Sequence, residues 1–203
     1  MHIDFPEGIP TVNQYRAIVS SDSFRHMESF SVDFLKKYHR ELEYYRTKWV
    51  NDPLHQWSRQ WEYPYVFQHI KRYSEGKQGI TILDAGSGIT FFPFYIHQAL
   101  NPVGIRCCDY DENLELLYGN IINNQPINLQ FRHADLHQLP YEDLSFDIIY
   151  CISVLEHTID YLTILREFRR VLKPGGRLIV TFDISTDGRS EEHTSELQSP
   201  NTI

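Results

Sequence analysis

The sequence has few cysteines and no long apolar run. Its three cysteines, Cys107, Cys108 and Cys151, suit a reducing compartment, and none has the spacing of a metal site. No segment approaches the roughly 18 uninterrupted apolar residues of a membrane span. Residues 1–6 also lack the basic region and apolar stretch of a secretory signal. We therefore expect a cytoplasmic protein with no membrane span.

Basic charge is also scarce. The chain has 19 Lys and Arg against 27 Asp and Glu, for a formal net charge of -8. This balance argues against a nucleic-acid binder, because neutralising phosphates requires clustered Lys and Arg. His97, His133 and His137 have no spacing that suggests a metal. The composition favours a small molecule as partner, without nucleic acid or metal, and indicates no particular oligomeric state.

Length and patterning predict one domain that begins with a helical cap. The chain has 203 residues, of which 41% are hydrophobic, and this suits one globular domain. Between residues 22 and 50, apolar side chains recur at helical steps and predict one long amphipathic helix. A second helix is expected over residues 63–73, with Pro64 in its first turn. Residues 1–78 are therefore predicted to form an N-terminal helical cap.

After this cap, strands alternate with helices. Such alternation predicts an α/β fold with a parallel sheet, right-handed crossovers and helices on both faces. Cys107 and Cys108 are adjacent on one expected strand, so their side chains should point to opposite faces. Residues 173–176 are expected to form a turn that ends the last helix. The strands are expected over residues 80–84, 103–108, 127–132, 146–152 and 176–182, and the helices over 90–100, 112–123 and 160–172.

The end of the chain has a different character. Residues 189–199 read Arg-Ser-Glu-Glu-His-Thr-Ser-Glu-Leu-Gln-Ser, without an apolar period. A common sequencing adapter, translated in frame, encodes these residues in the same order. We interpret residues 189–203 as a non-native tail, exclude them from the fold, and expect the natural protein to continue. The predicted core then covers residues 79–188.

A glycine turn follows the first expected strand. Asp84-Ala85-Gly86-Ser87-Gly88 combines an acid with glycines, which lack the Cβ atoms that block close backbone approach. The next helix offers free N–H groups to a ligand. Glycine in such a turn can also serve a purely steric purpose. Phe91 stands where a dinucleotide fingerprint has its third glycine, and a bulky ring disfavours pyrophosphate binding there.

Acidic residues follow the second and third expected strands. Asp109 lies at the end of the second strand, where a carboxylate can accept hydrogen bonds from ribose hydroxyls. It could instead be a turn or capping residue. Asp135 follows the third strand and could accept from an exocyclic adenine amine, or serve only in a turn.

Two further segments complete an ordered set of motifs. Residues 146–157 read Phe-Asp-Ile-Ile-Tyr-Cys-Ile-Ser-Val-Leu-Glu-His, and residues 169–178 read Arg-Arg-Val-Leu-Lys-Pro-Gly-Gly-Arg-Leu. With these motifs the chain resembles the class I S-adenosylmethionine-dependent methyltransferases with a methyltransferase type 11 core, over residues 79–184. The resemblance implies a Rossmann-like sheet and S-adenosylmethionine as the cofactor. The family ordinarily ends with two further strands, so the final strands are expected to be missing here.

The resemblance also implies roles for individual residues. Asp84, Gly86 and Gly88 would surround the methionine part of the cofactor, and Asp109 would bind the ribose. Thr90 departs from the family's common third glycine. Asp135 and Leu136 would contact the adenine, and Cys151 to Ser153 would line the site below the sulfonium. The complete set of implied cofactor-binding residues is Asp84, Ala85, Gly86, Ser87, Gly88, Asp109, Tyr110, Asp135, Leu136 and Cys151.

The expected activity is methyl transfer to a small-molecule acceptor, such as an oxygen of a lipid, sugar or metabolite. His157 is the best candidate for a general base, because a reference pKa of about 6.5 suits proton acceptance. It could equally be a helix-start histidine fixed by hydrogen bonds. A nicotinamide-dependent oxidoreductase and a non-catalytic S-adenosylmethionine-binding module are the alternatives. An aromatic cluster could line the acceptor pocket or simply pack the cap on the sheet, and consists of Trp57, Trp61, Tyr63, Tyr65 and Phe67.

Overall fold

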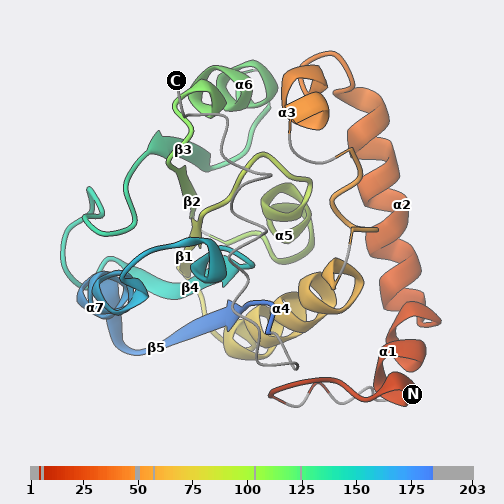
Figure 1. Ribbon diagram of the computed structural model, residues 1–203, viewed down its shortest axis with the longest axis horizontal. Coiled ribbons are helices and arrows are strands. Elements are labelled where there is room, and N and C mark those ends of the chain that lie inside the picture. Colours follow the sequence, from red (N-terminus) through yellow and green to blue (C-terminus); the bar gives the residue numbers. More distant parts are fainter. Residues whose placement is uncertain are drawn as a thin grey trace.

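The computed structural model of the chain describes residues 5, 7–48, 51–56, 58–102, 104–123 and 125–184 (Figure 1). Residues 185–188 of the predicted core, the predicted tail 189–203 and Trp57 of the aromatic cluster lie outside these residues. None of the described helices is both long and apolar enough to cross a membrane. The helices are α1 (Val12–Val19), α2 (Asp22–Lys37), α3 (Glu43–Lys48), α4 (Arg59–Ser74), α5 (Phe92–Leu100), α6 (Asn113–Ile122) and α7 (Tyr161–Val171), and the strands are β1 (Thr81–Ala85), β2 (Gly104–Asp109), β3 (Leu129–His133), β4 (Phe146–Ile152) and β5 (Leu172–Thr181).

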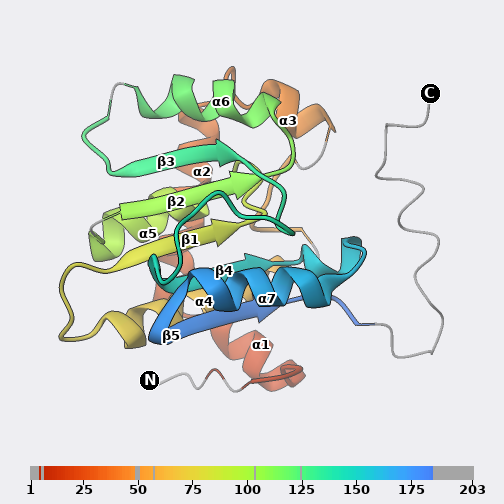
Figure 2. The same cartoon turned by 90° about the vertical axis from the view of Figure 1, so that its left-hand side faces the viewer.

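The strands form one parallel sheet in the order β3-β2-β1-β4-β5 (Figure 2). This confirms the predicted α/β fold with a Rossmann-like sheet. β1 lies between β2 and β4, so the strand order reverses beside it. In open α/β sheets a ligand binds outside the carboxyl ends of the strands at such a switch point. The topology therefore directs attention to the turns after β1, β2 and β4.

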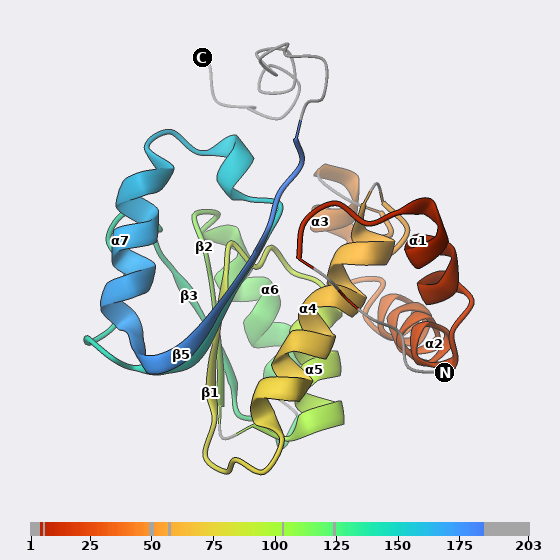
Figure 3. The same ribbon diagram turned by 90° about the horizontal axis from the view of Figure 1, so that it is seen from below.

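Helices cover both faces of the sheet, as predicted. α4 and α5 lie on one face and α7 on the other (Figure 3). Cys107 packs in the core on the α4 and α5 side, whereas Cys108 packs in the core on the α7 side. The prediction that these neighbours face opposite ways is confirmed. Both faces of the central strands are buried, which explains their nearly continuous apolar sequences.

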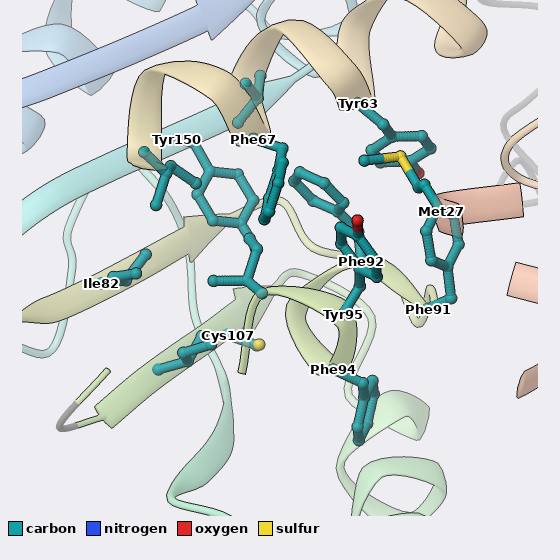
Figure 4. Close-up of a cluster of buried hydrophobic side chains, with 14 of the residues drawn as sticks. Met27, Tyr63, Phe67, Ile82, Phe91, Phe92, Phe94, Tyr95, Cys107 and Tyr150 are labelled. Atoms are coloured by element: carbon teal, nitrogen blue, oxygen red, sulfur yellow. The ribbon is translucent and has the colours of Figure 1, made fainter. Parts of the chain in front are cut away.

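The N-terminal helices share one hydrophobic core with the sheet. Phe34 of α2 packs on Phe94 of α5, with ring centroids 4.8 Å apart. Tyr63 of α4 packs on Phe92, with centroids 4.7 Å apart, and Phe92 in turn meets Tyr150 of β4 (Figure 4). The division into a cap and a core at residue 78 stays a prediction, since side chains from both parts form a single cluster.

The long helix predicted over residues 22–50 is wrong in its continuity. α2 ends at Lys37, and Tyr38 caps it with φ -109° and ψ 26°. A turn follows before α3 begins at Glu43. The turn places Leu42 in the core and directs Tyr45 of α3 to the turn after β1. The helix thus ends where packing on the sheet requires a turn, although the apolar pattern that predicts a helix continues in the sequence.

Two other boundaries differ from the predictions. α4 begins at Arg59, one turn earlier than expected, so Pro64 lies inside the helix and leaves one backbone acceptor without its helical donor. Residues 173–176 do not separate α7 from the last strand, because β5 begins at Leu172. A register shift in the β4–β5 pairing accommodates the extra residues, and Gly175 has a φ of +74° there.

Candidate cofactor site

A cavity of about 520 Å³ lies at the carboxyl ends of β1, β2 and β4. Asp84 and the glycine turn line it from β1, Asp109 from β2, and Ser153 just after β4. The N-terminal helices contribute Tyr45, Arg59 and Tyr63 to the same cavity. Its volume falls in the usual range of small-molecule sites, about 300–1,000 Å³. The predicted turns therefore meet at one ligand-sized space.

The glycine turn needs its glycines for both conformation and space. Gly86 has a φ of +75° and Gly88 a φ of +50°, which is the left-handed region. A Cβ on Gly86 would lie 2.5 Å from Val154 Cγ2, and a Cβ on Gly88 would collide with the Tyr45 hydroxyl. The N–H groups of Gly86 and Ser87 donate to the Cys108 carbonyl. Close packing against Val154 thus explains why residue 86 is a glycine. At Gly88, Tyr45 of the N-terminal helices contacts the turn.

Gly86→Ala is expected to lower the free energy of unfolding by about 1–3 kcal/mol, because the new methyl group overpacks against Val154 and φ is positive. Urea denaturation measures this change. Gly119→Ala is the matched control: Gly119 lies within α6 and has nothing closer than 3.9 Å to the new methyl. That variant should gain about 0.5–1 kcal/mol. Equal effects at the two positions would contradict the packing argument.

The Asp109 carboxylate organises the turn while it lines the cavity. Oδ2 accepts from the Gly88 N–H at 2.9 Å, and Oδ1 accepts from the Asp111 N–H at 3.1 Å. Burial raises the pKa of Asp109, and these N–H donors oppose the rise. A carboxylate has about four acceptor sites, so the oxygens can accept further hydrogen bonds from a ligand. The turn interpretation and the ribose interpretation are thus compatible.

Asp84 is the most perturbed acid of the cavity. Its side chain lies at the end of β1, is 5% exposed, and accepts a hydrogen bond of 2.8 Å from the Tyr150 hydroxyl. Burial raises the pKa of Asp84 to about 8, the Tyr150 hydrogen bond opposes the rise, and the charge of Asp109 adds to it. A buried carboxylate of this kind suits a cationic ligand group, because a positive charge favours its ionised form.

An arginine network joins α4 to the end of β4. Nη1 of Arg59 donates to Glu62 and to the Ser153 hydroxyl. The Ser153 hydroxyl donates to the Glu62 carboxylate, at 2.9 Å from Oε1, and Glu62 is only 3% exposed. Ser153 has a φ of +47°, an uncommon conformation for a residue other than glycine. Arg59 and Tyr45 were not predicted from the sequence, because no local motif links residues 1–78 to the strand ends, whereas Tyr63 was predicted only as a member of the aromatic cluster.

His157 lines the cavity from a short 3-10 helix, Leu155–His157. Its backbone N–H donates to Val154. Within the described part of the chain its imidazole has no hydrogen-bond partner. The ring is therefore not fixed by hydrogen bonds to those residues, in contrast to the alternative interpretation of this histidine.

Other predicted site residues divide into two groups. Ser87 and Tyr110 line the cavity. The cavity lining does not include Asp135, whose Oδ1 accepts instead from the His137 N–H at 2.9 Å. The remaining three, Ala85, Leu136 and Cys151, are buried in the core on the α7 side.

The aromatic cluster of the cap mostly packs on protein. Of its described members only Tyr63 lines the cavity. Trp61 packs on Phe5 and Tyr65, while Phe67 packs on Tyr95. Among the described residues, no group of three or more His, Cys, Asp or Glu could hold a metal ion.

Comparison with known proteins assigns the central part of the chain. A family model for a methyltransferase domain matches residues 83–180, which include the end of β1, all of β2 and β4, and the turns that build the cavity. Residues 83–180 form a class I methyltransferase domain. The cofactor that the sequence resemblance implies is S-adenosylmethionine. The cavity fits this cofactor, because the glycine turn lines it together with two acids. Asp109 can accept hydrogen bonds from ribose hydroxyls, and Asp84 suits a cationic group.

Similar proteins carry the same domain. Over 103 residues the chain is 36% identical to demethylmenaquinone methyltransferase of Lactococcus lactis, a match that covers 50% of this chain and 41% of that protein. The solved structure of a candidate S-adenosyl-L-methionine-dependent methyltransferase from Methanococcus maripaludis is 28% identical, with a TM-score of 0.52, and the match covers 59% of this chain and 55% of that one. A SAM-dependent methyltransferase from Aquifex aeolicus has the same fold at 21% identity, with a TM-score of 0.51 and coverage of 64% and 69%.

The chain spans about two fifths of the length of the curated relatives that it matches. Activity, acceptor and partners of the whole protein are therefore matters for proposal.

Proposed function

We propose that the protein transfers a methyl group from S-adenosylmethionine to a small-molecule acceptor. The observation that carries this proposal is the meeting of the glycine turn, Asp84 and Asp109 at one cavity at the sheet's switch point. The curated relatives named as demethylmenaquinone methyltransferases support a small molecule as acceptor. An oxygen of a lipid, sugar or metabolite is the acceptor atom we propose.

Within this function, we propose that different residues of the cavity bind different parts of the cofactor. Asp109 is proposed to hold the ribose, with Tyr110 beside it, and Asp84 to face the cationic amino-acid end. Asp135 and Leu136 are proposed to approach the adenine after the loop following β3 adjusts. The sulfonium supplies an already activated methyl group, so the protein has mainly to align donor and acceptor.

His157 is the proposed general base when the acceptor must lose a proton. It lines the cavity with an imidazole that has no hydrogen-bond partner in the described residues. A ring nitrogen can then accept a proton from an acceptor hydroxyl placed between His157 and the methyl group. An acceptor that has no proton to lose would not need this step.

The structure gives the alternatives less support. Phe91 is fully buried between α2, α4 and α5, at the position where a nicotinamide enzyme has its third glycine. Calorimetry with S-adenosylhomocysteine and with NAD separates the two functions. We expect binding of the thioether nucleoside and none of NAD, and the opposite result would overturn the proposal. Transfer of labelled methyl to a metabolite extract then distinguishes an enzyme from a non-catalytic binding module.

Asp109→Ala is expected to weaken binding of S-adenosylhomocysteine by about 1.5–3 kcal/mol for each charge-assisted hydrogen bond lost. Isothermal titration calorimetry measures the change. Asp143→Ala is the control, since Asp143 is an exposed partner of Arg170 outside the cavity lining, and its affinity should equal that of the unmodified protein. Unchanged affinity in Asp109→Ala would remove this residue from the site.

A further inference from the structure

The guanidinium of Arg59 is only partly used by the protein. Both of its hydrogen bonds to described residues come from Nη1, to Glu62 and to Ser153. Nε and Nη2 make none to the described part of the chain, and Arg59 lines the cavity. Arginine presents its N–H groups in a planar fork that matches a carboxylate with two parallel hydrogen bonds. The side chain therefore offers donors to a ligand in the cavity.

The neighbours of Arg59 hold this fork in place. Both oxygens of Glu62 accept from the Ser153 hydroxyl, at 2.9 and 3.0 Å, and Oε2 also accepts from Arg59. Glu62 is nearly inaccessible to solvent, so its carboxylate is committed to this network. The network fixes Nη1 of Arg59 and leaves Nε and Nη2 without a hydrogen-bond partner among the described residues. An already oriented donor loses less conformational entropy when it binds a ligand.

Arg59 and Asp109 lie beside different strands of the sheet. Asp109 lies at the end of β2, whereas Arg59 contacts Ser153 just after β4. β1 separates these strands, and two strand spacings amount to about 10 Å. A ligand that runs across β1 would place a hydroxyl-bearing group at Asp109 and an anionic group at Arg59. S-adenosylmethionine has this order, with the ribose and the carboxylate on opposite sides of its sulfur.

We propose that Arg59 binds the carboxylate at the amino-acid end of S-adenosylmethionine. This inference rests on the proposed function, because it requires the cofactor to occupy the cavity. It assigns to a helix before the methyltransferase domain, α4, a direct contact with the cofactor. A carboxylate on the acceptor would satisfy the same fork, and the experiment separates these two sources.

The test compares two ligands that differ in one group. S-adenosylhomocysteine has the carboxylate, and decarboxylated S-adenosylhomocysteine lacks it but keeps the amine. We expect the unmodified protein to bind the first about 10- to 100-fold more tightly, the range for a charge-assisted pair. In Arg59→Gln this ratio should fall to about threefold or less, with little change in affinity for the decarboxylated ligand. Calorimetry measures the four affinities.

Two further variants complete the experiment. Arg59→Lys keeps the charge but loses the fork, so its ratio should lie between the other two. Arg170→Gln is the matched control, because Arg170 lies in another ion-pair network, with Glu167 and Asp143, outside the cavity lining. Its ratio should equal that of the unmodified protein.

Each contrary outcome has a distinct meaning. An unmodified protein that binds neither ligand overturns the proposed function together with this inference. Equal affinity of the unmodified protein for both ligands overturns the inference alone and needs no variant. An equal loss of both ligands in Arg59→Gln also overturns it, since that pattern indicates a structural role. A ratio that survives in Arg59→Gln overturns the inference as well, since another group then binds the carboxylate of the cofactor and leaves the fork to a carboxylate from another source, such as the acceptor.

Discussion

Asp84→Asn is expected to make the protein more stable at pH 8 and to leave its stability at pH 4 nearly unchanged. Burial raises the pKa of Asp84 from 3.8 to about 8, so the folded protein prefers the neutral carboxyl. For a carboxyl raised in this way, its stabilising effect is complete below the unfolded pKa and is lost as the pH rises through the folded pKa. Between about pH 4 and pH 8 the unfolded chain ionises while the folded protein keeps the proton, so the free energy of unfolding falls as the pH rises.

Asparagine removes this pH-dependent cost. Its amide is similar in shape to a neutral carboxyl, and its oxygen can still accept from the Tyr150 hydroxyl. Each unit of pKa difference corresponds to about 1.4 kcal/mol, so the gain in stability at pH 8 is expected to be on the order of a few kcal/mol. Urea denaturation at pH 4, 6 and 8 measures the difference between the variant and the unmodified protein. A difference that does not grow with pH would contradict the raised pKa.

The same substitution is expected to weaken binding of S-adenosylhomocysteine, because the ligand's ammonium group loses an ionisable partner. Tyr150→Phe is the companion variant, since it retains the carboxyl and removes the hydrogen bond that opposes the rise in pKa. Stabilisation of Asp84→Asn together with loss of ligand affinity would show that the acid is retained for binding at a cost in stability.

Phe91→Ala is expected to lower the free energy of unfolding by about 3–5 kcal/mol, which is a large share of the 5–15 kcal/mol typical of a domain. The Phe91 ring is fully buried and contacts Phe30 of α2, Tyr63 of α4 and Phe92 of α5. Its removal leaves a cavity where three helices meet. Urea denaturation measures the loss. Leu116→Ala, at a leucine that is 70% exposed, should change stability by less than about 0.5 kcal/mol.

The shared core also predicts how the protein unfolds. All three tryptophans lie in the N-terminal 61 residues, so their fluorescence reports on the cap, while circular dichroism reports on the whole chain. If the cap helices and the sheet form one cooperative unit, both signals should change at the same denaturant concentration. Separate transitions would show that residues 1–78 fold independently.

Local patterns were sufficient to predict the sheet and part of the site. Alternating strands and helices predict the parallel sheet because each element buries a face that its own periodicity reveals. Asp84, the glycine turn and Asp109 were found for a related reason: in a parallel sheet, the residues after each strand lie at the same edge. Asp135 shows the limit of this rule, since its carboxylate turns to His137.

By itself, therefore, the sequence determined the fold class, the strand ends and the acids beside them, because these depend on residues close together in the chain. Only the tertiary structure decided how the N-terminal helices complete the cavity. The break after Lys37 places Tyr45 over Gly88, and α4 brings Arg59 to Ser153, 94 residues away. Such contacts, and the burial that raises the pKa of Asp84, depend on which surfaces meet in space, and no local periodicity encodes them.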